Sequence, residues 1–309
     1  MKLLRPLLVV LVIAAVIWIA RLFTPHHEGN VFQVLFGHLM PQRLVLGAHG
    51  GGAPRPLLAL ELPQGLGFFD MDWKSPGNQL VLTNLQLFQV AAVVLIFVCF
   101  LGVPRHLKTG RGDVASRLFA GFAAWIRDEM VVPVMGKELG NRLLPMFLSI
   151  FFFILFMNLL GLIPGGATAT ASVFVTGALA AITFASMLVG GMVAQGPIAY
   201  WRNLVPHVPV FMLPLMFAVE LIGLLVKPIA LMIRLFANMT GGHLAVLTLM
   251  GLILLFGAMS PTMGWLSSPV AVGLAVFIMI IETFVALLQA YIFTMLSILF
   301  IQASVHPAH

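Results

Sequence analysis

Long apolar runs separated by short polar segments dominate the chain after about residue 80. Val81–Leu101, Leu144–Ile163 and Thr170–Val193 are each close to the ~20 residues that an upright helix needs to cross a bilayer. Phe211–Phe256 and Trp265–Ile301 are longer, with 46 and 37 residues. Helices of that length must tilt strongly, bend or protrude. The pattern predicts an all-α polytopic membrane protein with five core helices, the last two lying tilted against something broad in the membrane plane.

A charge-free loop, Gly257–Met263, is predicted between the two long helices, because Pro261 interrupts the apolar pattern. Such a short link makes the two helices antiparallel neighbours.

The N-terminal segment, residues 1–23, contains a further apolar run that follows two cations. It could be a cleavable signal peptide or a first span. The bulky Trp18 and Ile19 beside Ala20 make a poor cleavage site, which favours an uncleaved signal anchor.

Residues 24–80 are rich in glycine, proline and histidine and show no clear helical or strand period. We therefore expect a mostly irregular extension on the periplasmic side, followed by a membrane domain over residues 81–309. The histidines of this extension lack the regular spacing of metal ligands, so a solvated loop is favoured over a metal site; they are His26, His27, His38 and His49.

Composition and charge agree with a membrane protein. The chain is 61% hydrophobic and 8% charged, whereas soluble domains have roughly 25% charged residues. The net charge of +6 is not arranged as a basic stripe with aromatics, so no nucleic-acid partner is expected. Instead, cations gather in Val103–Leu143, with seven against four acids. By the positive-inside rule, this loop and both chain ends are cytoplasmic.

Within that basic loop, Val114–Val134 carries bulky apolar residues at helical spacing. An amphipathic helix on the membrane surface fits this pattern, and so does a helix packed on a partner protein.

The chain after Arg142 carries only five formal charges in 167 residues; they are Arg202, Glu220, Lys227, Arg234 and Glu282. A cation at membrane depth costs at least ~2.5–3.5 kcal/mol, so it normally faces a partner or a wet cavity. Glu220, Lys227 and Arg234 are spaced by seven and therefore share one helix stripe. Asn238 is one turn past Arg234, on nearly the same face.

Arg234 has no acid at its own level in this chain, since Glu220 is 14 residues away. A buried ion pair that only fixes helix register is therefore disfavoured. We expect Arg234 to face outward, together with Leu231 and Asn238, toward a carboxylate on another chain. Lys227 could also snorkel to the cytoplasmic headgroups.

The last helix offers Glu282 and Gln289, again seven apart. In an antiparallel pair, His243 and Glu282 lie at similar depths and both can change protonation, as a proton relay requires. Gln289 is predicted near the level of Arg234. Gly241 and Gly242 leave little side-chain bulk beside His243, which would allow close packing or water.

Three strings of this sequence closely resemble subunit a of the F-type ATP synthases. They are KPIALMIRLFANMTGGH (Lys227–His243), IETFVALLQAYIF (Ile281–Phe293) and FMNLLGLIP (Phe156–Pro164). The resemblance runs from about Phe68 to Gln302 and does not cover the N-terminal extension.

The resemblance implies roles for single residues. Arg234 would be the family's essential arginine, which faces the ring of c subunits, with Gln289 opposite. His243 and Glu282 would line the periplasmic half-channel, in the order of the mitochondrial branch and some bacteria. Asn158 would lie on the half-channel wall. The remaining matches are to polar positions of the same pathway, at Glu220, Lys227 and Asn238.

The resemblance also implies a multi-pass subunit of a bacterial inner membrane, with the c ring and the subunit b stator as partners. It implies no cofactor, no metal and no covalent catalysis by this chain alone. A free-standing, proton-coupled secondary transporter is the alternative function, although no internal repeat of the transporter kind is evident.

Overall fold

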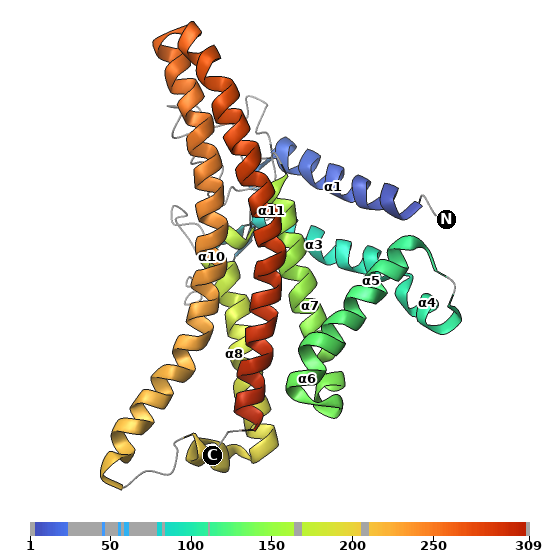
Figure 1. Ribbon diagram of the computed structural model, residues 1–309, viewed down its shortest axis with the longest axis vertical. Helices are drawn as coiled ribbons and strands as arrows, with labels where there is room; N and C mark the ends of the chain where they lie inside the picture. The colour runs from blue at the N-terminus through green and yellow to red at the C-terminus, as the bar shows by residue number, and fades with distance from the viewer. Residues whose placement is uncertain are drawn as a thin grey trace. The chain divides into compact units, whose positions relative to one another are not determined.

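The computed structural model describes residues 4–23, 45–46, 55–56, 59–61, 79–81, 84–110, 112–163, 169–204 and 210–306 (Figure 1). Almost all of these residues are helical. The main helices in chain order are α1 (Leu4–Phe23), α3 (Asn84–Phe100), α4 (Val103–Thr109), α5 (Val114–Trp125), α6 (Val132–Met135), α7 (Lys137–Leu162), α8 (Val173–Gln195), α9 (Pro197–Asn203), α10 (Leu213–Met259) and α11 (Pro261–Val305). Short 3-10 turns at Ala169–Ala171 and Val210–Met212 precede α8 and α10.

Within the described residues, five helices are long and apolar enough to cross a membrane. They are built on α3, α7, α8, α10 and α11, the five runs that the sequence predicts. The all-α polytopic class is therefore confirmed. At 47 and 45 residues, α10 and α11 are longer than the apolar pattern indicated. At ~1.5 Å per residue each far exceeds the ~30 Å hydrocarbon core; their tilt against a partner stays a prediction.

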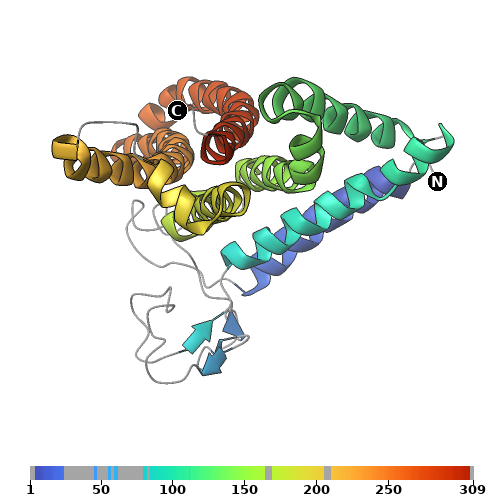
Figure 2. The same ribbon diagram turned by 90° about the horizontal axis from the view of Figure 1, so that it is seen from below.

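The N-terminal part of the chain holds α1 and four short strands. The strands pair antiparallel, β1 (Val45–Leu46) with β2 (Arg55–Pro56) and β3 (Ala59–Glu61) with β4 (Gln79–Val81). The predicted extension therefore contains some regular structure, and its four histidines lie outside the described residues. The apolar helix α1 contacts α3 (Figures 1 and 2).

The contacts divide the chain into two compact units. Unit 1 comprises residues 1–101, 156–169 and 239–286, and unit 2 comprises residues 102–155, 170–238 and 287–309. Helices α7, α10 and α11 contribute residues to both units.

In unit 1, the second half of α10 and the first half of α11 run side by side as an antiparallel hairpin (Figures 1 and 2). The predicted seven-residue loop between them is wrong, because only Ser260 separates the two helices. Pro261 does break the chain, but as the first residue of α11, where its missing N–H costs no helical bond. The Ser260 and Thr262 hydroxyls lie 2.7 Å apart at this turn.

Two glycines let the backbones of this hairpin touch. A Cβ built on Gly264 would lie 2.7 Å from Cα of Gly257. Real Cβ atoms do not approach a backbone atom so closely, and a backbone cannot rotate away as a side chain can. Small residues at such crossings allow close helix packing in membranes, so this contact joins α10 to α11 just below their turn.

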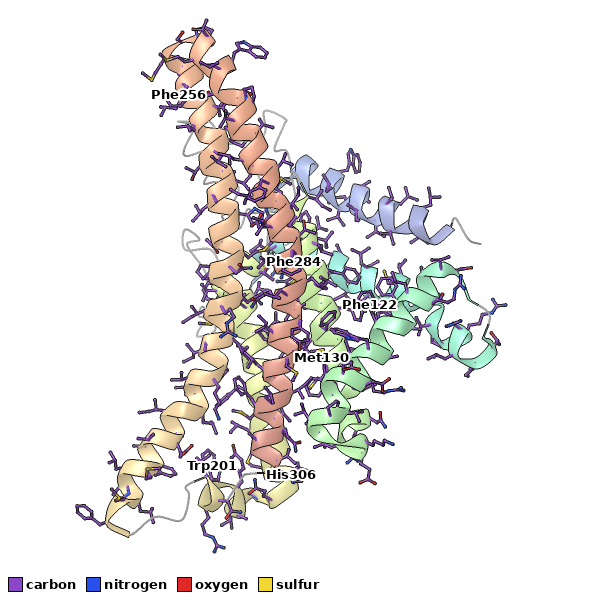
Figure 3. The ribbon with its side chains drawn as sticks, in the orientation of Figure 1. Phe122, Met130, Trp201, Phe256, Phe284 and His306 are labelled. Carbon is purple, nitrogen blue, oxygen red and sulfur yellow. The ribbon has the colours of Figure 1, made fainter. Side chains whose placement is uncertain are left out.

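In unit 2, polar side chains tie α11 to α8. The Thr183 and Ser297 hydroxyls are 3.2 Å apart, the Ser304 hydroxyl donates to the Met187 carbonyl at 2.7 Å, and the Gln195 amide donates to the Ser304 carbonyl at 2.8 Å. Hydrogen bonds between helices matter here because lipid provides little hydrophobic force for association. Trp201 and His306 mark the neighbouring ends of α9 and α11 (Figure 3).

The predicted helix over Val114–Val134 is present, but it contains a feature that the pattern did not reveal. A π-helical segment, η2 (Ile126–Val131), lies between α5 and α6. It buries Met130 (Figure 3) and leaves Arg127 and Asp128 exposed. The Arg127 guanidinium donates to the Asp128 carboxylate at 2.8 Å, which lowers the pKa of Asp128. The location of this helix, on the membrane surface or against a partner protein, stays a prediction.

We predict that Gly264→Ala loosens the hairpin, costing about 1–3 kcal/mol through overpacking against Gly257. The matched control is Gly273→Ala on the same helix, where an added Cβ has no neighbour within 4 Å. That change should be neutral or stabilise by up to ~1 kcal/mol. The single, buried Cys99 serves as reporter: its reaction with a thiol dye on heating should begin at lower temperature in Gly264→Ala only. Equal onset temperatures in both variants would exclude a tight contact.

Candidate functional site

One face of α10 is buried against the chain's own helices. Over residues 213–239 the buried residues recur at helical spacing; they are Leu224, Pro228, Leu231, Leu235 and Met239. Arg234 does not belong to this row: its side chain is exposed although the adjacent Leu235 is fully buried. The helix therefore directs its arginine away from the surface by which it packs in unit 2.

No carboxylate of the described residues lies within ion-pair distance of Arg234. In that part of the chain the Arg127–Asp128 contact, between adjacent residues, is the one acid–base pair observed. Glu220, the nearest acid along α10, is half-buried two heptads earlier. The arginine is thus placed where a carboxylate from outside the chain could reach it.

Leu231 does not share this outward surface. It is 1% exposed, so the expectation that it faces outward with Arg234 is wrong. Position 231 is separated from 235 by one helical turn, which places both in the same buried row. Asn238 is half-buried, while Ala230 and Ala237, about one turn to either side of Arg234, are exposed.

Lys227 has a partner inside unit 2. Its ammonium nitrogen lies 5.7 Å from the centre of the Phe300 ring, a cation–π distance. The side chain therefore points at α11, and the contact links α10 to the last two turns of that helix.

Gln289 is buried, with 3% of its surface exposed, and its Nε2 has no hydrogen-bond partner among the described residues. No hydrogen bond joins it to Arg234 in that part of the chain. One and a half turns later, the hydroxyl of Thr294 is likewise buried and unpartnered there. Polar residues thus continue along the buried side of α11; the sequence shows them only as scattered hydroxyls in an apolar run.

In unit 1, the carboxyl group of Glu282 lies against α10 at Gly242, the residue before His243. A Cβ built on Gly242 would overlap the Glu282 carboxyl group. Glu282 is half-buried, and its Oε1 is buried without a hydrogen-bond partner among the described residues. The hairpin therefore brings an ionisable group of α11 to the level of a histidine of α10.

Asn158, on α7 in unit 1, is fully buried. Neither its Nδ2 nor its Oδ1 has a hydrogen-bond partner among the described residues. A buried amide normally satisfies such atoms, so Asn158 offers both a donor and an acceptor inside an apolar span.

The described residues contain no group of three histidine, cysteine, aspartate or glutamate side chains that could hold a metal ion. On α10 the ionisable side chains lie seven or more residues apart; they are Glu220, Lys227, Arg234 and His243. His243, and Glu282 on α11, are of types that can each bind and release a proton.

These observations define a class: an α-helical, multi-pass membrane protein whose long helices carry isolated ionisable residues. Comparison with known proteins identifies the family. Residues 86–302 match the family described as "ATP synthase A chain", and the chain belongs to this family.

Similar proteins are described as ATP synthase subunit a. The chain is 46% identical over 221 residues to the ATP synthase subunit a of Myxococcus xanthus, covering 71% of each chain. It is 34% identical over 234 residues to that of Rhodopseudomonas palustris, covering 75% of this chain and 92% of the relative. For Chloroherpeton thalassium the identity is 38% over 230 residues, or 73% and 67% of the two chains. The range matched by the family, residues 86–302, includes every candidate residue named above.

Proposed function

We propose that this chain is the stationary membrane subunit of an ATP synthase, which conducts protons through two half-channels and couples their flow to rotation of a c-subunit ring. Membership in the ATP synthase A chain family supports the assignment to this complex. The observation that carries the mechanism is Arg234, exposed on a long apolar helix whose neighbouring Leu231 and Leu235 are buried.

The partner of Arg234 is a carboxylate on the ring. An isolated guanidinium at membrane depth is costly, and arginine stays charged at any accessible pH. Its charge favours the ionised form of a carboxyl group that comes within a few ångströms. A ring carboxyl that reaches Arg234 therefore releases its proton toward the cytoplasm. The fixed cation also opposes direct proton passage between the two half-channels.

Proton uptake occurs from the periplasmic side near His243 and Glu282, with Asn158 on the wall of this half-channel. A proton passed to the ring neutralises its carboxylate, and a neutral carboxyl group can cross lipid far more cheaply than a charged one. Glu220, Lys227 and Asn238 line the pathway on the Arg234 side, with Gln289 on the facing helix. Each charge that crosses contributes ~2.3 kcal/mol per 100 mV.

The complex sits in the inner membrane of a bacterium, with the chain's C-terminus in the cytoplasm and subunit b as a stator partner. The excess of cations in residues 103–143 supports this orientation. The chain performs no covalent step and needs no cofactor. Its role is to generate torque on the c-subunit ring and to couple rotation of the ring in one direction to proton flow.

We predict that Arg234→Ala abolishes ATP-driven proton pumping in inverted membrane vesicles while the complex still assembles, because the side chain is exposed and does not belong to the buried row of α10. Arg234→Lys should also fail largely, since an ammonium lacks the planar, two-pronged donor geometry of a guanidinium. The control is Arg202→Ala on α9, an exposed cation that should be dispensable. Wild-type pumping by Arg234→Ala would rule out the proposed role.

A second prediction concerns the uptake side. His243→Ala or Glu282→Ala should each slow pumping, and the exchange His243→Glu with Glu282→His should restore part of it. Both orders of the two residues place one acid and one imidazole at the same level. The rate of vesicle acidification, normalised to the amount of complex, measures the effect. An exchange variant no better than the slower single variant would argue against a shared role.

A further inference from the structure

We propose that Ser304 is a positioning residue: through it, α8 and α9 hold the last turn of α11 and so keep Gln289, on the same helix, in place while the ring turns. This inference rests on the proposed function. It adds to that function a requirement outside the proton pathway named above.

Two hydrogen bonds within unit 2 attach Ser304 to α8. Its hydroxyl donates to the Met187 carbonyl at 2.7 Å, and its carbonyl accepts from the amide of Gln195, the last residue of α8, at 2.8 Å. Carbonyls in the last turn of a helix have no partner within that helix, so the second bond satisfies one of them. Because one bond uses the side chain and the other the backbone, the end of α11 can neither rotate nor slide along α8 without losing one of them.

A glycine of α8 provides the space for this contact. A Cβ built on Gly191, which is buried, would overlap both the Ser304 hydroxyl and the ring of Tyr200 on α9. Tyr200 is 3% exposed, and its hydroxyl oxygen lies 3.4 Å from that of Ser304. The Asn203 amide of α9 in turn donates to Oε1 of Gln195 at 3.1 Å. The corner between α8 and α9 therefore meets Ser304 from two sides.

The held end of α11 lies on the same rigid helix as a residue of the proposed pathway. Gln289 is 15 residues before Ser304, or ~22 Å along the axis at ~1.5 Å per residue. A continuous helix carries rotation or sliding along its length, so release of the last turn would displace Gln289. In the proposed function the ring exerts force on the stationary subunit at every step. Hydrogen bonds between helices resist such force where lipid gives little hydrophobic attraction.

A cysteine pair can both report this contact and replace it. A Cβ built on Gly190 lies 3.6 Å from Cγ2 of Val305, and the two Cβ atoms of a disulfide are ~3.8 Å apart. Gly190→Cys with Val305→Cys, in a Cys99→Ser background, should therefore join α8 to α11 under mild oxidation. The intact ATP synthase is assayed in inverted membrane vesicles, reduced and oxidised. Subunit content reports assembly, and the rate of acidification per assembled complex reports pumping.

We expect the cysteine pair alone to form the disulfide and to pump in both states. In the reduced state, added Ser304→Ala should slow acidification and disulfide formation about threefold or more, the range of interhelical hydrogen bonds in membranes; the loss is partial because Thr183 and Ser297 still join the two helices. Oxidation should restore acidification, because the disulfide replaces the lost bond. The control is Ser149→Ala on α7, an exposed serine whose hydroxyl donates to the Pro145 carbonyl of its own helix at 2.8 Å. It should change neither rate.

Three results would overturn the inference. They are wild-type acidification by the reduced Ser304→Ala variant, equal losses in Ser304→Ala and Ser149→Ala, or a loss that the disulfide does not restore. The last result would mean that the hydroxyl acts by its own chemistry and not by holding the helix. If Ser304→Ala assembles poorly, Gln195→Leu, which removes the other bond and keeps the serine, is judged by the same criteria.

Arg234→Ala, measured in parallel, separates this inference from the proposed function. A pumping Arg234→Ala would refute the function itself. An inactive Arg234→Ala beside a fully active, reduced Ser304→Ala would refute only the positioning role of Ser304.

Discussion

The proposed function of this membrane protein depends above all on one feature, the placement of the Arg234 guanidinium on an apolar helix. Arg234 lies in a 47-residue apolar helix, no described carboxylate pairs with it, and its side chain is exposed while its neighbour Leu235 is fully buried. A lone cation in lipid is stable only if something outside the chain compensates it. The proposed partner is a ring carboxylate that pairs with Arg234 only transiently. Pairing compensates the charge of the arginine, and because it favours the ionised carboxylate, it makes the carboxyl group release its proton.

The proposed uptake side depends on a different constraint, the closeness of two helix backbones. One residue separates α10 from α11, and Gly257 and Gly264 let the helices touch near this turn. About four turns away on α10 and five on α11, Glu282 reaches the backbone of α10 at Gly242. The carboxyl group of Glu282 thus occupies the space that a side chain at position 242 would fill.

Much of the fold could be predicted from the sequence because apolar run length determines which segments can span a bilayer. The exposure of Arg234 was likewise predictable, since the nearest acid along its helix, Glu220, is 14 residues away. The burial of Leu231 and of Gln289 was not, because in a helix that is apolar all round the pattern does not reveal which face packs inside. The loop at residues 257–263 was overestimated, since glycine and proline near a turn can stay helical when the backbones pack closely. The π segment of residues 126–131 has no signal in the spacing of apolar residues.

The most direct test of the outward-facing arginine is disulfide cross-linking between this chain and a c subunit with a cysteine beside its carboxylate, in a Cys99→Ser background. Cysteine at position 237, which is exposed three residues after Arg234, should cross-link to the ring. Cysteine at position 235, which is fully buried one residue after Arg234, should not. Cross-linking from 235 but not from 237, or none from either in an active complex, would contradict the account.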